Sequence, residues 1–95
     1  MSAEDEVEHR RRRARFRSWH RGTREMDLIL GSFADAEIAH LTLAELEQYE
    51  VLLELPDTDF YQWISGERAP PPSVPRDLFL RIRAFLRDRP MSVFP

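Results

Sequence analysis

Apolar residues in this 95-residue chain recur every three to four positions within each segment that lies between glycines and prolines. One such stripe consists of Met26, Ile29, Leu30 and Phe33. This spacing places apolar side chains on one side of an α-helix, whereas a half-buried strand alternates apolar and polar residues. No segment shows that alternation. The sequence therefore predicts an all-α fold, a small single-domain bundle of about five short helices.

Glycine, proline and one capping motif set the limits of the first three predicted helices. The first covers about residues 9–20 and ends before Gly22, and the second runs from about residue 23 to residue 40. The T-L-A-E motif at residues 42–45 is a capping box that opens the third helix, which Pro56 ends.

Two further helices are predicted after that proline. A short fourth helix has Asp57 or Thr58 as its cap and ends near Gly66. The A-P-P-P-S-V-P stretch at residues 69–75 is expected to be a stiff extended connector, because proline lacks the amide N–H that a helix needs. Residues 76–89 then resume helical periodicity up to a proline. Outside the second helix, the apolar residues expected in the core are Phe16, Trp19, Leu43, Leu46, Tyr49, Leu52, Leu53, Phe60, Trp63, Ile64, Leu78, Phe79, Ile82, Phe85 and Leu86.

The length of the chain suits one domain with a modest core. We expect this domain to span residues 9–90, between a flexible acidic tail at residues 1–8 and a short tail at residues 91–95. The absence of cysteine excludes disulfides and thiolate metal sites. No apolar run approaches the ~20 residues of a membrane span, and the acidic first residues do not match a signal or transit peptide. We therefore expect a soluble intracellular protein without membrane insertion.

Charge is segregated along the chain although the net charge is only -3. Residues 1–8 carry four acids, and residues 9–24 carry eight arginines and no acid. Residues 25–67 carry eleven acids and no lysine or arginine, and residues 68–95 carry six arginines and two aspartates. This pattern predicts a molecule with one strongly cationic region and one strongly anionic region, which favours an oriented encounter with a partner.

Residue types suited to catalysis or metal binding do not form a recognisable constellation. The sequence shows no nucleophile elbow, Walker loop or dinucleotide-binding glycine pattern. His9, His20 and His40 are too widely spaced for the i, i+4 pair of a helical metal site. We therefore predict no catalytic residue, no metal and no enzyme activity.

The arginine-rich segment at residues 10–17, with Trp19 close by, supports an alternative function. Arginines neutralise phosphates and aromatic rings stack on bases, so a small basic-helix nucleic-acid-binding or regulatory protein is conceivable. The eleven acids of residues 25–67 weigh against this alternative, because they would repel phosphate from the helices that could read a groove. We expect no nucleic-acid partner.

The junction R-G-T-R-E at residues 21–25 separates the first two predicted helices. Structural reasons for these residues exist, because Gly22 permits a backbone shape that other residues resist and Glu25 complements the positive end of the second helix. Spacing alone favours that structural explanation over a binding site.

A wider match changes this balance. The run R-F-R-S-W-H-R-G-T-R-E-M-D-L from Arg15 to Leu28 closely resembles the opening signature of the SdhE-type FAD assembly factors, the succinate dehydrogenase assembly factor family. The RGxxE core of that signature falls on Arg21, Gly22 and Glu25, and Asp27 fits its continuation. A second family signature resembles L-P-D-T-D-F-Y-Q-W at residues 55–63. The chain departs from the common pattern at His20 and Thr23, and it matches little after Gly66.

The resemblance implies a five-helix assembly factor rather than an enzyme. Its implied partner is the flavoprotein subunit of succinate dehydrogenase, with fumarate reductase as a second candidate client. The factor promotes covalent attachment of FAD to a histidine of that subunit, and the chain itself binds no cofactor. Since the first residues do not match a mitochondrial presequence, we expect the bacterial cytoplasm rather than the mitochondrial matrix, and we expect a monomer when the factor is free.

The resemblance also implies a partner-binding site. We expect Arg21, Gly22 and Glu25 at its centre. Arg21 would pair bidentately with a client carboxylate, Gly22 would let two backbones approach, and Glu25 would contact the client or hold Arg21 in place. The surrounding residues of the expected site are Arg15, Arg17, Arg24 and Asp27.

Overall fold

This computed structural model describes residues 2–88 of the chain. They contain five α-helices and one 3-10 turn. Their bounds are α1 (Ala3–Trp19), α2 (Arg24–Glu37), η1 (Ile38–His40), α3 (Leu43–Leu53), α4 (Asp57–Ile64) and α5 (Arg76–Arg87). No strand occurs within these residues, so the predicted all-α bundle is confirmed. The predicted tail at residues 91–95 and the stop at Pro90 lie outside the described part.

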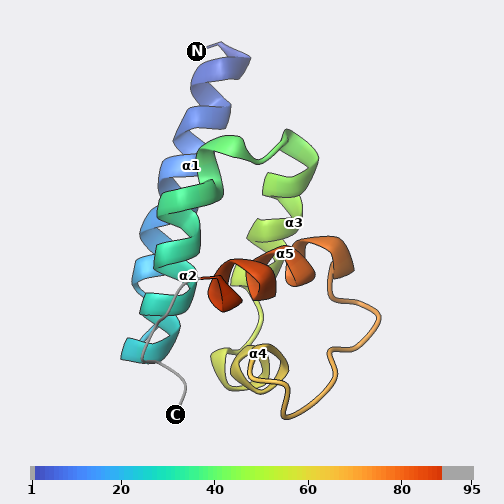
Figure 1. The fold of residues 1–95 in the computed structure, drawn as a ribbon. Coiled ribbons are helices and arrows are strands. Elements are labelled where there is room, and N and C mark those ends of the chain that lie inside the picture. Colours follow the sequence, from blue (N-terminus) through green and yellow to red (C-terminus); the bar gives the residue numbers. More distant parts are fainter. Residues whose placement is uncertain (1, 89–95) are drawn as a thin grey trace.

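Helices α1, α2 and α3 form the main part of the bundle, and α5 packs against α2 and α3. α1 and α2 lie side by side and run in opposite directions, and α3 runs in the same direction as α1 (Figure 1). α5 crosses in front of α3 and contacts both α2 and α3, whereas α4 lies near the end of the molecule where α1 turns into α2 (Figure 1). The α1–α2 junction and the start of α4 therefore lie at the same end of the bundle.

The apolar stripes predicted for α2, α3 and α5 form the core, with one exception on α3 and one on α5. All four stripe residues of α2 are buried, as are the four later apolar residues predicted for α3. Leu43 is 46% exposed, so its predicted core position is wrong. It belongs to an exposed run that includes Thr42 and Ala44 on either side of it, because the capped first turn of α3 lies outside the core. Phe85 of α5 is only partly buried but packs against the core.

α1 begins six residues earlier than predicted. The expected tail at residues 1–8 is helical from Ala3, with Ser2 accepting a hydrogen bond from the Asp5 amide at 3.2 Å. Acids in the first turn complement the positive helix end, and Val7 packs against the core. The acidic composition that suggested a tail is thus also the composition of a helix N-terminus.

The buried side of α1 consists of small residues instead of aromatic ones. Ala14 and Ser18 are its buried residues, whereas Phe16 is 62% exposed. The predicted core position of Phe16 is therefore wrong. Trp19 is half-buried and lies over Gly31 of α2. Small residues allow α1 to approach its neighbours closely, which leaves no room for a phenylalanine ring on that side.

Arginine side chains attach α1 to the rest of the bundle. Arg10 pairs with Glu50 of α3, Arg17 with Glu54, and Arg15 with Asp35 of α2. Arg11 donates to the backbone carbonyls of Ile38 at 2.7 Å and Leu41 at 3.0 Å. The basic segment therefore lies against the acidic segment in the folded chain, and the predicted separation of a cationic and an anionic region is largely wrong.

A buried hydrogen-bond chain joins α1, α2 and α3. The Ser18 hydroxyl donates to the Ala14 carbonyl at 2.7 Å and lies 2.6 Å from the Tyr49 hydroxyl, which is also 3.3 Å from the Leu30 carbonyl. Burial raises the pKa of Tyr49, because the low-polarity core disfavours the phenolate. The hydroxyls are thus neutral and paired inside the core, where unpaired polar groups are costly.

Candidate functional site

The junction between α1 and α2 is a tight turn built around Gly22. Its φ of 110° lies in the region that L side chains rarely adopt, which confirms the predicted conformational role of this glycine. Thr23 then caps α2, because its hydroxyl accepts a hydrogen bond from the Met26 amide at 3.3 Å. The junction between α1 and α2, residues 20–23, is here called the hinge.

The Arg21 side chain is directed into the molecule. Its guanidinium bonds Asp57 at the start of α4, with Nε to Oδ1 at 2.9 Å and Nη2 to Oδ1 at 2.8 Å. It also donates to the carbonyls of Leu53 at 2.8 Å and Leu55 at 3.3 Å. The two charged side chains are only 11% and 19% exposed. Arg21 thus joins the hinge to the end of α3 and the start of α4.

Asp27 supports the hinge from the other side. Its carboxylate accepts a hydrogen bond from the Arg21 amide at 2.6 Å, across the turn that contains Gly22. The backbone and the side chain of Arg21 are therefore held by two different aspartates, Asp27 and Asp57. Within residues 2–88, Glu25 makes no hydrogen bond or ion pair with Arg21, and it is exposed on the first turn of α2.

Gly22, Thr23, Arg24 and Glu25 form an exposed crest between two hollows. The hollow on the α1 side has a volume of about 570 Å³, and its lining includes Trp19, Gly22, Thr23, Arg24 and Asp27. The hollow on the α4 side has a volume of about 450 Å³, and its lining includes Thr23, Glu25, Asp57, Tyr61 and Glu67. An added Cβ at Gly22 would meet nothing within 4 Å, so this backbone is open to an approaching partner.

The structure gathers only part of the expected site around this crest. Gly22, Arg24, Glu25 and Asp27 lie at the hinge. Arg15 faces Asp35, which is ten residues beyond Glu25 along α2 and therefore about 15 Å farther along the helix. Arg17 faces α3, where it bonds Glu54 at 2.6 Å. Arg17 also lies 3.5 Å from the Leu53 carbonyl that Arg21 bonds, so both arginines are engaged within the chain but only Arg15 is remote from the hinge.

Two features of the hinge were not predicted. Asp57 was expected to act only as a helix cap, yet Pro56 occupies the N-cap position and Asp57 holds Arg21. The acidic turn before the fourth helix was the sequence signal that could have indicated this pairing. The second feature is the stack of Phe16 on His20, with ring centroids 3.9 Å apart, which follows from their i, i+4 spacing on exposed helix positions.

This arrangement is suited to binding a protein surface. The crest offers an exposed carboxylate, an exposed guanidinium and a glycine backbone between two shallow hollows. Within residues 2–88, no three histidines or acids are grouped as metal ligands. None of the helices in the same range has the length and apolar character needed to cross a membrane.

Comparisons with known proteins agree with the resemblance noted in the sequence. The chain is 44% identical over 64 residues to the FAD assembly factor SdhE of Acetobacter pasteurianus, which covers 67% of this chain and 59% of that protein. It is 33% identical over 87 residues to the mitochondrial succinate dehydrogenase assembly factor 2 of Dictyostelium discoideum, which covers 92% of this chain and 62% of that protein. The chain thus spans about three fifths of the length of these two relatives. No solved structure matches it.

The match to a family extends over most of the chain and includes the hinge, α3, α4 and nearly all of α5. Residues 12–86 match the family described as the flavinator of succinate dehydrogenase, and this chain therefore belongs to that family.

Proposed function

We propose that this chain binds the flavoprotein subunit of succinate dehydrogenase and promotes the covalent attachment of FAD to it. The family match over residues 12–86 carries this proposal, because the family description names that enzyme and that action. The names of the two relatives point to the same role. Fumarate reductase is a second candidate client.

In this proposal the chemistry takes place within the client. The new bond joins a client histidine to the flavin, and the assembly factor supplies neither a catalytic group nor a cofactor-binding site. A partner that binds one client conformation better than another shifts the equilibrium toward that conformation. The shift in free energy equals the difference between the two binding free energies. The factor therefore acts by holding the client in an arrangement that permits attachment.

The crest at the hinge is the proposed client-binding surface. Glu25 is the side chain that contacts the client, since it is exposed while Asp57 and Asp27 hold Arg21. Gly22 allows close approach of the client backbone. Arg21 has a positioning role in place of the bidentate client contact considered from sequence, because its guanidinium already bonds Asp57 and two carbonyls.

The four residues expected around the centre of the site have two different roles in this proposal. Arg24 and Asp27 border the α1-side hollow and extend the surface. Arg15 and Arg17 contribute by holding α1 in place, through Asp35 and Glu54. We also propose that the bacterial cytoplasm is the setting, on the basis of the similarity to the Acetobacter factor.

The nucleic-acid alternative loses support from the pairing of α1. Arg10, Arg15, Arg17 and Arg21 all bond carboxylates of the same chain. Phosphate would have to compete with these carboxylates, so the arginine run is a poor measure of the charge that a nucleic acid would meet.

The test is co-expression of this chain with its cognate flavoprotein subunit, with covalent flavin read by in-gel fluorescence. We expect the chain to increase covalent flavin and Glu25→Gln to reduce the increase. Loss of one charge-assisted contact of about 1–2 kcal/mol weakens client affinity roughly 5- to 30-fold. Gly22→Arg should have the same effect, with circular dichroism confirming that the bundle remains folded.

Glu47→Gln is the matched control. Glu47 is an exposed glutamate on α3, so this substitution removes the same charge at a position away from the hinge. Covalent flavin that does not depend on the chain would refute the proposed function. Full activity of both Glu25→Gln and Gly22→Arg would refute the proposed surface while leaving the function intact.

A further inference from the structure

Three arginines of α5 keep their positive charge unpaired after folding. Arg76, Arg83 and Arg87 are all exposed there. Within residues 2–88, none of these three side chains has a hydrogen-bond or ion-pair partner, whereas Arg81 of the same helix bonds Glu37 and Glu45. The cationic surface available to a partner therefore includes α5, besides the exposed Arg12 and Arg13 of the arginine-rich segment.

The three arginines share one side of α5 with an exposed leucine. At 3.6 residues per turn, Arg76, Leu80, Arg83 and Arg87 lie within about 60° around the helix axis. Leu80 is 44% exposed and lies between the arginines along the helix. The buried residues of α5 are centred more than 100° away around the helix axis and lie in the core, so this side is directed toward solvent. We call the surface formed by these four residues the α5 face.

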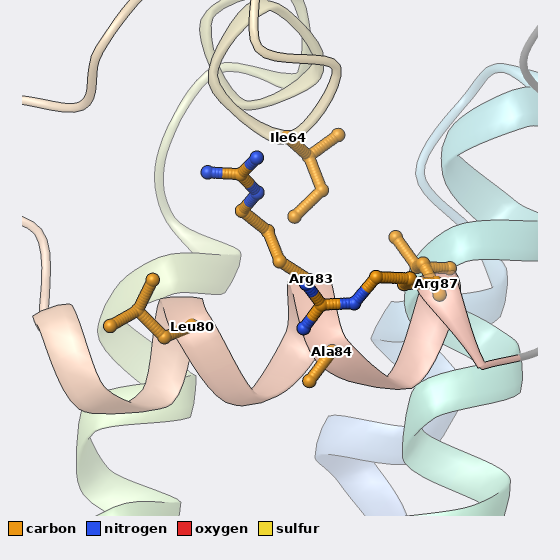
Figure 2. Close-up of a pocket in the computed structure, with 6 residues that line it drawn as sticks. Ile64, Leu80, Arg83, Ala84 and Arg87 are labelled. Carbon is orange, nitrogen blue, oxygen red and sulfur yellow. The ribbon is translucent and has the colours of Figure 1, made fainter.

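Two hollows adjoin the α5 face. One has a volume of about 620 Å³ and is lined by Ile64, Leu80, Arg83, Ala84, Leu86 and Arg87. Figure 2 shows Arg83 extending from α5 toward Ile64 at the end of α4, with Leu80 one turn before it and Arg87 one turn after it.

The second hollow, of about 540 Å³, lies on the other side of Leu80 and Arg83, which border both hollows. Its lining includes Pro70, Pro71, Pro72 and Arg76. Both hollows thus combine an apolar lining with guanidinium groups at the edge.

This combination selects for a particular kind of partner. Arginine forks bind carboxylates bidentately, and an exposed leucine next to apolar hollows is suited to an apolar side chain. Arg83 and Arg87 are four residues apart on one helix, where like charges repel each other in the free protein. An acidic partner would relieve that repulsion, so charge complementarity favours a carboxylate-rich segment.

We propose that the α5 face is a second docking surface for the flavoprotein client, which presents an acidic segment with an apolar side chain that enters the hollow between α4 and α5. This inference rests on the proposed function. α4 separates the two surfaces, since Thr58 and Tyr61 line the hollow beside Glu25 while Ile64 lines the hollow beside Arg83. A single client that spans α4 therefore contacts both surfaces.

The test measures binding of the full chain to the purified flavoprotein subunit of succinate dehydrogenase by titration calorimetry at several salt concentrations. The double variant Arg83→Gln, Arg87→Gln should raise the Kd about tenfold and make it less dependent on salt, because two screened attractions are lost. Leu80→Gln should also raise the Kd, but without changing the salt dependence. The melting temperature of this double variant, called the α5 variant below, should stay close to that of the wild type, because removal of the like-charge pair offsets the loss of Arg87 at the C-terminal end of α5.

The matched control is Arg12→Gln, Arg13→Gln, which removes the same charge from exposed positions of α1. We expect its Kd to stay within about twofold of the wild type, since these residues lie away from both surfaces. A higher Kd for the α5 variant than for this control would support a specific contact at the α5 face over a general effect of net charge.

Several results would overturn the inference. If the wild type and Arg12→Gln, Arg13→Gln bind the client, Glu25→Gln binds it weakly, and the α5 variant binds like the wild type, the α5 face is not a client contact although the proposed function stands. If the wild type does not bind the client, both proposals fail.

Other occupants give different outcomes, each of which contradicts the inference. A dimer in sedimentation equilibrium that the α5 variant abolishes would assign the face to a second copy. Binding to phosphatidylserine vesicles or duplex DNA near physiological salt that is lost in the α5 variant, with client affinity unchanged, would assign it to a phosphate-bearing surface.

Discussion

The Trp19 ring occupies the space that a side chain at Gly31 would need. A Cβ built at Gly31 would lie 2.2 Å from Cδ2 of Trp19, and the two next nearest atoms also belong to the ring. The ring is held in place by its N–H, which donates to Asp35 at 3.1 Å, and Asp35 also accepts from Arg15 at 2.6 Å. One glycine thus sets the distance between α1 and α2 just before the hinge.

We predict that Gly31→Ala destabilises the protein although alanine is the better helix former. The gain in helix propensity is about 1 kcal/mol, and displacement of a hydrogen-bonded ring costs more, for a net loss of about 1–3 kcal/mol. Urea denaturation measures this loss. In a Trp19→Leu background the same change should cost less, because the ring is gone. Stabilisation by Gly31→Ala in the wild-type background would show that Trp19 moves aside freely.

The elements at one end of the bundle are connected through Arg21. Its guanidinium reaches the last carbonyl of α3, the Leu55 carbonyl just after that helix and the first acidic residue of α4, while its backbone belongs to the turn between α1 and α2. Helix ends leave four carbonyls without intrahelical partners, and an arginine near the end satisfies some of them. Arg21 therefore positions the crest relative to α4.

We predict that Arg21→Lys destabilises the protein by about 1–3 kcal/mol, because a single ammonium cannot reproduce the planar fork that bonds Asp57 and two carbonyls. Urea denaturation with a check of the m-value measures the effect. Arg12→Lys is the control, and as an exposed change it should stay within about 0.5 kcal/mol. Equal stability of Arg21→Lys and the wild type would mean that charge alone holds the hinge.

Across the whole molecule, the separate charge blocks of the sequence are brought into contact. Pairs between the basic segment and the acidic helices recur along the bundle, from Arg10–Glu50 on α1 to Arg21–Asp57 at the hinge. The hydrogen bond from Arg10 lowers the pKa of Glu50. The Thr42 amide of the capping box lowers the pKa of Glu45, with Arg81 adding to the effect. Ionised carboxylates therefore contribute to the folded state.

We predict that the free energy of unfolding falls on acidification below about pH 4.5. The folded-state pKa values of Glu45 and Glu50 are depressed, so their contribution is present above the unfolded pKa and is lost as pH falls through the folded pKa. Urea denaturation at pH 5 and pH 3 measures the decrease. Glu50→Gln should be less stable than the wild type at pH 7 and should lose less stability between these two pH values. A larger acid loss in Glu50→Gln than in the wild type would contradict this assignment.

Local features were predictable because they depend on neighbours in sequence. The stripe on α2, the capping box at Thr42 and the positive φ of Gly22 all follow from residues within one or two helical turns. Of the candidate site, the exposed carboxylate of Glu25 and the open backbone at Gly22 are where the sequence led us to expect them. The environment of Arg21 was not predictable, because its partner Asp57 is 36 residues away.

The sequence by itself determined five helical segments and the family to which the chain is similar, since both are encoded in short-range patterns and a nearly continuous motif. Only the tertiary structure decided which charges remain available. It uses four arginines of the basic segment to hold the bundle together, and it leaves others exposed on α1 and α5. The physical reason is that ion pairing depends on distance in space, which a linear count of charges does not contain.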